Sequence, residues 1–463
     1  MRRLLLLSNR VTPLQTGAGN RGATGGLAVA IHDALSESHG LWFGWSGRIA
    51  ESETERRLNT EEKEHYQVTT IDLTEAELEG YYNGYSNGVL WPILHYRADL
   101  MEYHSAHFEA YRRVNELFAE QLAQQVRPGD LIWIHDYHLL LVAQELRKRG
   151  VDNPIGFFLH TPFPAPEALT ALPNHRELME GLCHCDLIGL QTRTDLRAFL
   201  DYLRFEAGGK VLDEERIECF GRRLRAGCFP ISIDPDGFAQ AAAQVRNEAR
   251  RRLLISLDGR RLLLGVDRLD YTKGLPQRIL SYEHLLEHHP EHRRRIAFLQ
   301  IAPHSRSEVP EYIHLRRRLE ELSGHVNGRF AELDWVPLRY VNRGLSRSAL
   351  AGVLRIASVA LVTPLRDGMN LVAKEYVAAQ DPEDPGVLLL SRFAGAAHEL
   401  DAALIVNPLD YEATGEALHQ ALAMSLEERQ ERWQAMMEVI RAQDVTRWWR
   451  SFVTRLAEDA WEA

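Results

Sequence analysis

Short apolar runs alternate with stretches of helical periodicity along the whole chain. In the first half, apolar runs typical of buried strands occur at residues 4–7, 41–45, 131–135, 155–159 and 187–190. Amphipathic stretches typical of helices lie between them, for example at residues 108–124 and 139–149. Strands that are apolar throughout, with helices between them, are typical of a parallel sheet covered on both faces. The pattern therefore predicts an α/β fold.

The same pattern starts again in the second half of the chain. A strand is predicted at 229–233, followed by a turn that contains Pro235 and an Arg-rich helix at 240–255. Further strands are predicted at 262–266, 296–300, 359–363 and 387–390. Because 463 residues exceed one ordinary core, we expect two Rossmann-like, doubly wound domains, residues 1–234 and 235–446. Ligands of such folds bind beyond the carboxyl ends of the strands, so the active site is expected in the cleft between the domains.

A final helix is predicted at residues 447–463. Its apolar positions form a wide, mainly aromatic stripe that includes Trp448, Trp449, Phe452, Leu456 and Trp461. So broad an apolar stripe has to be buried, and we expect this helix to pack back on the N-terminal domain.

Composition and charge narrow the function. Hydrophobic residues make up 45% of the chain and charged residues 26%, as in soluble enzymes. The formal net charge of -11 argues against a nucleic-acid partner, whose binding surface would be basic. No run approaches the roughly 18 apolar residues of a membrane span. The apolar start, residues 1–7, is too short for a signal peptide, so we expect a cytoplasmic protein that does not bind membranes.

A glycine-rich loop follows the first predicted strand. Gly17, Gly19 and Gly22 have the spacing of a dinucleotide-binding fingerprint, but Arg10 and Pro13 separate them from the strand end. The loop fits better as a flexible segment whose Gly25-Gly26 pair begins a helix at residues 27–35. Exposed backbone amides at a helix N-terminus suit a diphosphate.

Three patterns suggest a metal, and each has a simpler interpretation. Cys183, Cys185, Cys219 and Cys228 fit no common zinc spacing and are interpreted as buried thiols. Asp234 and Asp236 flank Pro235 at the domain junction, which favours a turn. His135, Asp136 and His138 precede an apolar run, so His138 is interpreted as a packed residue at a helix start.

The strongest local pattern is two cations at a strand end. Residues 265–274 read Gly-Val-Asp-Arg-Leu-Asp-Tyr-Thr-Lys-Gly and place Arg268 and Lys273 between a buried strand and a helix that starts near Leu275. Two cations with helix amides behind them can neutralise a diphosphate without a metal. A second pattern follows the strand that ends at Thr363, where a helix beginning near Asn370 carries Glu375 and can present its carboxylate to a sugar diol.

Other polar residues follow predicted strands. Asp136 and His160 stand at strand ends and are interpreted as partners for sugar hydroxyls. Tyr82 and Trp91 lie in aromatic segments of the kind that pack on pyranose rings. Arg306 follows a strand of the second domain.

Together these segments resemble the trehalose-6-phosphate synthases of glycosyltransferase family 20 over nearly the whole chain. The resemblance is carried by residues 8–10, 42–47, 133–138, 266–274 and, most specifically, 362–381, which read Val-Thr-Pro-Leu-Arg-Asp-Gly-Met-Asn-Leu-Val-Ala-Lys-Glu-Tyr-Val-Ala-Ala-Gln-Asp. It implies a GT-B fold with no metal and no cofactor. The implied reaction is retaining transfer of glucose from UDP-glucose to glucose 6-phosphate, by front-face attack in which the leaving phosphate takes the proton.

The resemblance also implies roles for individual residues. The residues expected to carry catalysis are Asp136, His160, Arg268, Lys273 and Asp367. Those expected to bind UDP-glucose are Gly25, Gly26, His160, Arg268, Lys273, Leu345, Asp367, Leu371, Val372 and Glu375. Those expected to bind glucose 6-phosphate are Arg10, Tyr82, Trp91, Asp136 and Arg306.

Several alternatives stay open at this point. The longer glycine-rich loop with Arg21, and Thr161 where several relatives have Ile, leave loop closure, donor preference and packing beside the acceptor undecided. UDP is not distinguished from ADP or GDP, and a homo-oligomer, dimer or tetramer, is expected without its size being decided. One rival is a family 20 relative with another acceptor, and Arg10, Tyr82 and Trp91 together favour glucose 6-phosphate. The other is a non-catalytic sugar-phosphate sensor, which would not need Arg268, Lys273 and Glu375 together.

Overall fold

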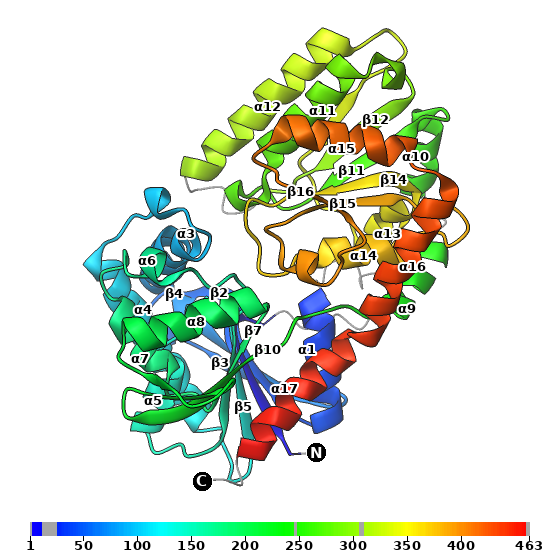
Figure 1. Ribbon diagram of the computed structural model, residues 1–463. Helices are drawn as coiled ribbons and strands as arrows, with labels where there is room; N and C mark the ends of the chain where they lie inside the picture. The colour runs from blue at the N-terminus through cyan, green and yellow to red at the C-terminus, as the bar shows by residue number, and fades with distance from the viewer. Residues whose placement is uncertain (1, 12–25, 245–247, 305–309, 460–463) are drawn as a thin grey trace. The chain divides into compact units, whose positions relative to one another are not determined.

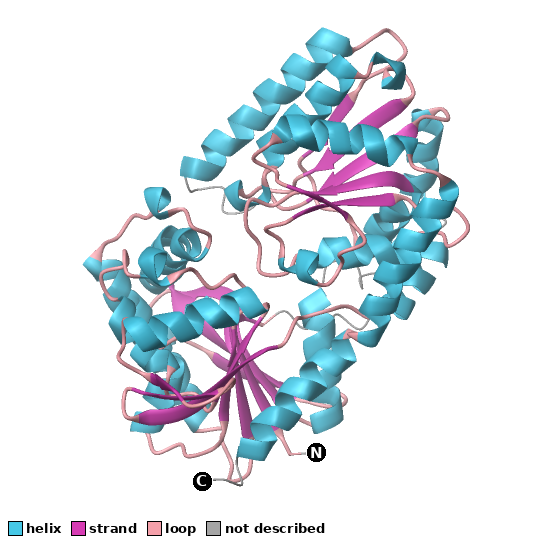
Figure 2. Ribbon diagram, viewed as in Figure 1, coloured by secondary structure: helices cyan, strands magenta, loops and turns pink. Residues whose placement is uncertain are grey.

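The structure is a computed structural model that describes residues 2–11, 26–244, 248–304 and 310–459. It divides into two compact units. The first contains the N-terminal strand, Leu27–Ile231 and, from the other end of the chain, Thr446–Ala463. The second contains Ser232–Val445. Each unit has a mainly parallel sheet with helices on both faces (Figure 2).

The first unit is built on a ten-stranded sheet with the order β3-β4-β2-β1-β5-β6-β7-β10-β9-β8. Its strands are β1 (Leu4–Arg10), β2 (Leu41–Ala50), β3 (Leu58–Glu62), β4 (Gln67–Thr74), β5 (Leu131–His135), β6 (Ile155–Phe158), β7 (Leu187–Leu190), β8 (Lys210–Val211), β9 (Arg216–Cys219) and β10 (Arg222–Cys228). The seven strands from β4 to β10 in this order pair in parallel, and antiparallel strands extend both edges. The buried residues of β1 and β5 are Leu, Ile and Trp, together with His135 at the end of β5, and this largely apolar content is expected for a sheet covered on both sides.

The helices of this unit differ in length and type. They are α1 (Gly26–Ser38), η1 (Glu53–Glu55), α2 (Glu75–Glu77), η2 (Leu78–Leu90), α3 (Trp91–Leu94), η3 (Ala98–Leu100), α4 (Ser105–Ala123), η4 (Tyr137–Leu139), α5 (Val142–Lys148), α6 (Pro166–Leu169), α7 (His175–Leu182), α8 (Arg193–Phe205) and α17 (Val445–Asp459). The segment η2 is a thirteen-residue π-helix, a rare conformation that frequently occurs at functional sites.

The last helix, α17, packs on the sheet of the first unit. Phe452 is fully buried and stacks on Trp133 of β5, with ring centroids 4.8 Å apart and an angle of 15° between the rings. Gly156 of β6 and Gly189 of β7 make room for it, because a Cβ at either position would lie 2.7 Å from the Phe452 ring. Phe452 of the C-terminal helix thus occupies the space left open by two glycines on neighbouring strands.

The second unit has a six-stranded, fully parallel sheet with the order β13-β12-β11-β14-β15-β16. Its strands are β11 (Arg261–Val266), β12 (Ile296–Ile301), β13 (Leu338–Val341), β14 (Ala357–Val362), β15 (Val387–Ser391) and β16 (Leu404–Val406). Numbered within the unit, this is the 3-2-1-4-5-6 order of the Rossmann fold. The strand order reverses between β11 and β14, so a ligand site is expected beyond the carboxyl ends of these two strands.

Two layers of helices cover this sheet (Figure 1). One contains α11, α12 and α15, and the other contains α9, α13, α14 and α16, with α10 beside α13. The helices are α9 (Pro235–Gln244), α10 (Glu248–Leu257), η5 (Tyr271–Lys273), α11 (Leu275–His288), η6 (Pro290–His292), α12 (Pro310–Phe330), α13 (Arg347–Ile356), α14 (Leu371–Ala379), η7 (Gly395–His398), α15 (Tyr411–Ala423) and α16 (Leu426–Ala442).

One predicted strand is wrong. Residues 229–233 form no strand, because the chain leaves the sheet after Cys228 and the NH of Ile231 donates to the Gln191 side chain at 3.0 Å. Pro230 has no NH to donate to a sheet neighbour, which explains why an apolar run here does not continue β10. In the range 240–255, where a helix is predicted, the described residues belong to the helices α9 and α10.

Candidate functional site

Three expected site residues follow neighbouring strands of the first unit. Arg10 ends β1, Asp136 follows β5 and His160 lies just beyond β6, and these strands are adjacent in the sheet. Asp136 has φ of +76°, a conformation that is costly for a residue with a side chain. Its own NH donates to the Phe158 carbonyl at 2.8 Å, and its carboxylate accepts from the His160 NH at 3.2 Å. The two strand ends therefore hold Asp136 in a conformation that it would otherwise avoid.

His160 is paired with a second histidine. The Nδ1 atom of His135 lies 2.9 Å from Nε2 of His160, so one nitrogen donates and the other accepts. Burial lowers the pKa of His160 to about 3 and lowers the pKa of His135 well below its usual range. His160 is thus neutral near pH 7 and can exchange hydrogen bonds with a sugar hydroxyl without adding charge.

Arg10 and Tyr82 lie among aromatic rings. The exposed Arg10 guanidinium lies over the Trp45 ring, 5.4 Å from its centroid. The Tyr82 ring stacks on His138 at 5.7 Å and an angle of 12°. Trp45 and Tyr82 are themselves 6.3 Å apart. A cation held over an aromatic ring and open to solvent is suited to an anionic group of a ligand.

Trp91 is much less accessible than Tyr82. Only 6% of Trp91 is exposed, and its ring packs against Tyr137 and His95. Little of the Trp91 surface is therefore accessible to a ligand.

In the second unit, a buried arginine joins the strand ends at the point where strand order reverses. Arg278 of α11 has no exposed surface. Its guanidinium donates to Asp267 after β11 (2.7 Å), to Thr363 after β14 (2.9 Å) and to Gln300 of β12 (3.1 Å). Burial raises the pKa of Asp267, and the positive charge of Arg278 opposes that shift. Three adjacent strands are thereby fixed to one helix.

Lys273 lies directly beside this network. Its ammonium group donates to the Asp367 carboxylate at 2.5 Å, and the Asn370 amide donates to the same oxygen at 3.0 Å. Lys273 is buried, whereas Arg268 on the same loop is exposed. The structure therefore brings Lys273 and Asp367, 94 residues apart, into one ion pair at the switch point of the sheet.

Close backbone contact makes this ion pair possible. Gly274, which precedes α11, has φ of +62°, and a Cβ there would lie 2.2 Å from the Thr363 carbonyl oxygen. The NH of Leu365 donates to the Thr272 carbonyl at 2.7 Å. Only glycine allows the loops after β11 and β14 to approach so closely.

Helix α14 begins at this same loop. Asn370, with φ of +74°, precedes Leu371 and Val372 in the first turn, where backbone NH groups have no partner within the helix. Glu375 lies one turn further along the helix. Burial raises the pKa of Glu375 to about 7, and Arg347 of α13 opposes this effect. The site thus combines helix amides, a paired lysine and a carboxylate that titrates near neutrality.

The remaining expected residues are placed as follows. Gly25 and Arg306 lie outside the described residues, and Gly26 is the first residue of α1. Leu345 is half-buried and stands just before α13. Thr161 is buried directly after His160.

The residues of the metal alternatives have other partners. Asp234 accepts from the Gly237 NH at 3.0 Å at the start of α9, and Asp236 forms an ion pair with Arg441 at 2.9 Å. His138 is buried beneath Tyr82. The four cysteines are free thiols, and three of them are buried.

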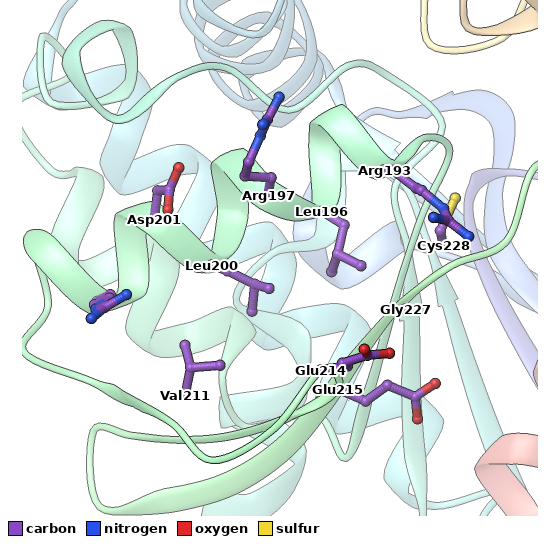
Figure 3. Close-up of a pocket in the computed structure, with 11 residues that line it drawn as sticks. Arg193, Leu196, Arg197, Leu200, Asp201, Val211, Glu214, Glu215, Gly227 and Cys228 are labelled. Atoms are coloured by element: carbon purple, nitrogen blue, oxygen red, sulfur yellow. The ribbon is translucent and has the colours of Figure 1, made fainter. Parts of the chain in front are cut away.

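A pocket of about 550 Å³ lies elsewhere in the first unit (Figure 3). Arg193 and Arg197 of α8 line it on one side and Glu214 and Glu215 on the other. None of the expected site residues lines this pocket. It therefore adds nothing to the site at the strand ends.

Sequence reasoning missed Arg278, Asn370 and His135 as parts of the site. Arg278 shares the buried face of α11 with Leu275, Ile279 and Tyr282, which follow the spacing of a buried helix face. A charged residue in that register was the signal that could have identified it. No sequence signal predicts the φ of Asn370 or the pairing of His135 with His160.

No helix in the part of the chain that the structure describes is both long and apolar enough to cross a membrane. Parallel sheets in two units, with phosphate-compatible and sugar-compatible groups at the strand ends, define a glycosyltransferase of the GT-B class. The model of glycosyltransferase family 20 matches residues 15–458, and the chain belongs to this family.

Its relatives are similar over their full length. A trehalose-6-phosphate synthase of Sinorhizobium fredii is 49% identical, and the alignment covers 98% of both chains. The crystal structure of a UDP-forming α,α-trehalose-phosphate synthase from Burkholderia xenovorans, in complex with glucose-6-phosphate, is 51% identical with a TM-score of 0.94 and covers 98% of this chain and 99% of its own. The E. coli enzyme bound with UDP-2-fluoro glucose is 46% identical, also with a TM-score of 0.94 and the same coverage.

The raised pKa of Glu375 generates a prediction on pH. Hydrogen bonds donated by a diol favour the ionised carboxylate, so a ligand that uses Glu375 must bind the minor, deprotonated form below a pH of about 7. We expect the affinity for UDP to rise about tenfold between pH 6 and pH 8, following the ionised fraction of Glu375. Isothermal calorimetry across this range measures the effect.

The variant Glu375→Gln is the control, because it keeps the shape and removes the titration. Any remaining pH dependence in Glu375→Gln belongs to UDP itself. Equal pH profiles in the two proteins would contradict the assignment.

Proposed function

We propose that this chain transfers glucose from UDP-glucose to glucose 6-phosphate with retention of configuration, giving α,α-trehalose 6-phosphate and UDP. The observation that carries the proposal is the Lys273–Asp367 ion pair at the switch point of a Rossmann sheet, in a chain that belongs to family 20. Similarity to the Burkholderia xenovorans and E. coli enzymes over almost their full length supports the same substrates.

The second unit would bind the donor. Arg268, Lys273 and the amides of Leu371 and Val372 would contact the diphosphate, with the Gly25-Gly26 segment as a further amide source. Glu375 would accept both ribose hydroxyls, and Leu345 would lie near the base. Two observations support this assignment: the residues described here lie at one sheet edge, and the first backbone NH groups of α14 have no acceptor within the helix.

The first unit would bind the acceptor. Arg10 would contact the 6-phosphate together with Tyr82 and with Arg306 of the other unit. Asp136 would accept from a sugar hydroxyl, and Trp91 would contact the ring. The exposed cation above Trp45 and the fixed orientation of the Asp136 carboxylate support these roles.

Retention follows from the chemistry of the bond. The donor is an α-glucoside and the product is α,α-linked, so the configuration at the transferred carbon is unchanged. We propose front-face attack by the acceptor hydroxyl as the bond to UDP lengthens, with the leaving phosphate taking the proton. Asp367 and neutral His160 would orient the transferred glucose. The Lys273 ammonium group, which donates to Asp367, would donate a hydrogen bond to the leaving diphosphate as negative charge develops there.

Charge stabilisation would then be the main contribution of the protein. Each fixed donor aimed at charge that develops in the transition state contributes roughly 2.7–4 kcal/mol. Arg268 and Lys273 would supply this without a metal ion. The expected homo-oligomer and cytoplasmic location remain predictions.

The direct test is an assay of purified protein with glucose 6-phosphate and UDP-, ADP- or GDP-glucose in excess EDTA. We expect UDP release with UDP-glucose, and an α,α-linked phosphorylated disaccharide by proton NMR. Binding of both substrates without turnover would favour the sensor instead. Activity restored only by Mg²⁺ or Mn²⁺ would contradict the role of the two cations, and turnover only with another acceptor would contradict the substrate.

Arg10 tests the acceptor half of the proposal. Arg10→Ala should raise the KM for glucose 6-phosphate at least tenfold, because a charge-assisted hydrogen bond to phosphate contributes roughly 1.5–3 kcal/mol. The affinity for UDP should not change. Arg57→Ala, at an exposed arginine of the same unit, is the matched control and should behave as the parent protein. Normal acceptor kinetics, or an equal loss of UDP affinity, would refute the assignment of Arg10.

A further inference from the structure

Histidines gather on the second unit, away from the residues discussed so far. His284 lies on α11 and His419 on α15. His289 directly precedes η6, and His292 is the last residue of η6. Glu291 and Glu416 lie beside them. We call these six residues the histidine cluster. Helices α11 and α15 pack against each other, so residues 127 or more positions apart meet here.

The cluster stands at the opposite edge of the sheet from Lys273 and Asp367. Helix α11 starts at the carboxyl edge, after Gly274, and its last turn leads through η6 to the beginning of β12. The cluster therefore lies at the amino edge of the strands. Nothing in the proposed transfer reaction uses this region.

Three side chains of the cluster converge with atoms that bind metals. One ligand atom each from His289, Glu291 and His419 lies within 4.8 Å of the others. A carboxylate oxygen of Glu291 is 3.4 Å from Nδ1 of His289 and 3.7 Å from Nδ1 of His419. The two imidazole rings stack at 3.8 Å. A further nitrogen, Nε2 of His292, is 2.9 Å from Nδ1 of His419.

A second carboxylate orients His289. Nε2 of His289 lies 3.0 and 3.1 Å from the two oxygens of Glu416, which also contacts Nε2 of His284 at 3.0 Å. When Nε2 of His289 carries the proton and donates it to Glu416, the lone pair of Nδ1 points toward Glu291. This carboxylate–histidine arrangement is the one that accompanies metal-binding histidines in proteins.

Two ring nitrogens of the cluster lie in direct contact. The 2.9 Å contact between His292 and His419 requires that at least one of the two nitrogens be unprotonated. Neutral imidazoles with inward lone pairs are ligands, whereas imidazolium ions are not.

We propose that His289, Glu291 and His419, with His292 as a neighbouring fourth donor, bind one Zn²⁺ ion or a divalent transition metal of similar preference. Imidazole nitrogen and carboxylate oxygen are the ligands of Zn²⁺ in such mixed sites. The ion would join η6 and the end of α11 to α15. Its role would be to stabilise the second unit, because the site lies at the sheet edge opposite to the proposed chemistry.

Zinc titration of the tag-free protein, after removal of metals by chelation, tests the proposal. Competition with a chromophoric chelator should give one site per chain, and Zn²⁺ should raise the unfolding temperature. His419→Asn should weaken this binding at least tenfold and abolish the rise in unfolding temperature. Glu416→Gln should weaken binding about tenfold, as the loss of an orienting carboxylate does.

The matched control is His325→Asn, on the exposed face of α12, where the His325 side chain lies 3.0 Å from the Glu283 carboxylate. Its zinc affinity and unfolding temperature should equal those of the parent protein. Co²⁺ bound to the parent should give a visible absorption band that His419→Asn lacks. Equal zinc affinity in the parent, His419→Asn and His325→Asn would overturn the proposal. It would also be overturned if the parent protein bound Zn²⁺ no more tightly than its other surface histidines do. Failure of the transfer assay would not affect this result.

Discussion

The carboxyl edge of the sheet in the second unit depends on a guanidinium that has no contact with solvent. Arg278 donates to groups that follow or belong to β11, β12 and β14, and it also contacts the backbone carbonyl of Lys273 at 3.3 Å. Burying an ion pair is costly unless its remaining hydrogen bonds are satisfied, and here nearly every donor of the fork is used. Removing one partner of such a pair typically costs about 3–5 kcal/mol. Because the same loops carry Lys273, Asp367 and Asn370, the geometry of the site and the stability of the unit have a common origin.

The first unit obtains a similar result by different means. Its described strand ends hold Asp136 at a positive φ and a pair of neutral histidines. The strain at Asp136 is tolerated because its backbone NH and carboxylate are both bonded to the β6 end. Beneath these groups, Trp133 and Phe158 pack against Phe452 of α17. The C-terminal helix therefore supports the strands whose ends carry Asp136 and His160.

Much of this arrangement could be predicted from sequence, because buried parallel strands have a clear pattern. The strands at 131–135 and 187–190 have the predicted bounds. Lys273 lies between the strand and the helix predicted to flank it, and Glu375 lies on the predicted helix. Strands with mixed polarity were missed, such as β13 with Arg339 and Tyr340, since their pattern resembles that of a loop. The apolar run at 229–233 was misread because periodicity cannot show that Pro230 ends pairing. Arg278 was missed since an arginine is ordinarily a surface residue, and long-range pairs such as Lys273–Asp367 have no local signal.

The affinity of the variant Arg278→Lys for UDP tests most directly whether the Arg278 guanidinium positions the site. Lysine keeps the charge but cannot donate along the separate directions to Asp267, Thr363 and Gln300. Calorimetry well below the unfolding temperature, with Arg294→Lys at an exposed position as the control, isolates the effect. We predict that Arg278→Lys stays folded and binds UDP at least tenfold more weakly, a loss of about 1.4 kcal/mol or more. A folded Arg278→Lys protein with the affinity of the parent would contradict the claim that this guanidinium positions the donor site.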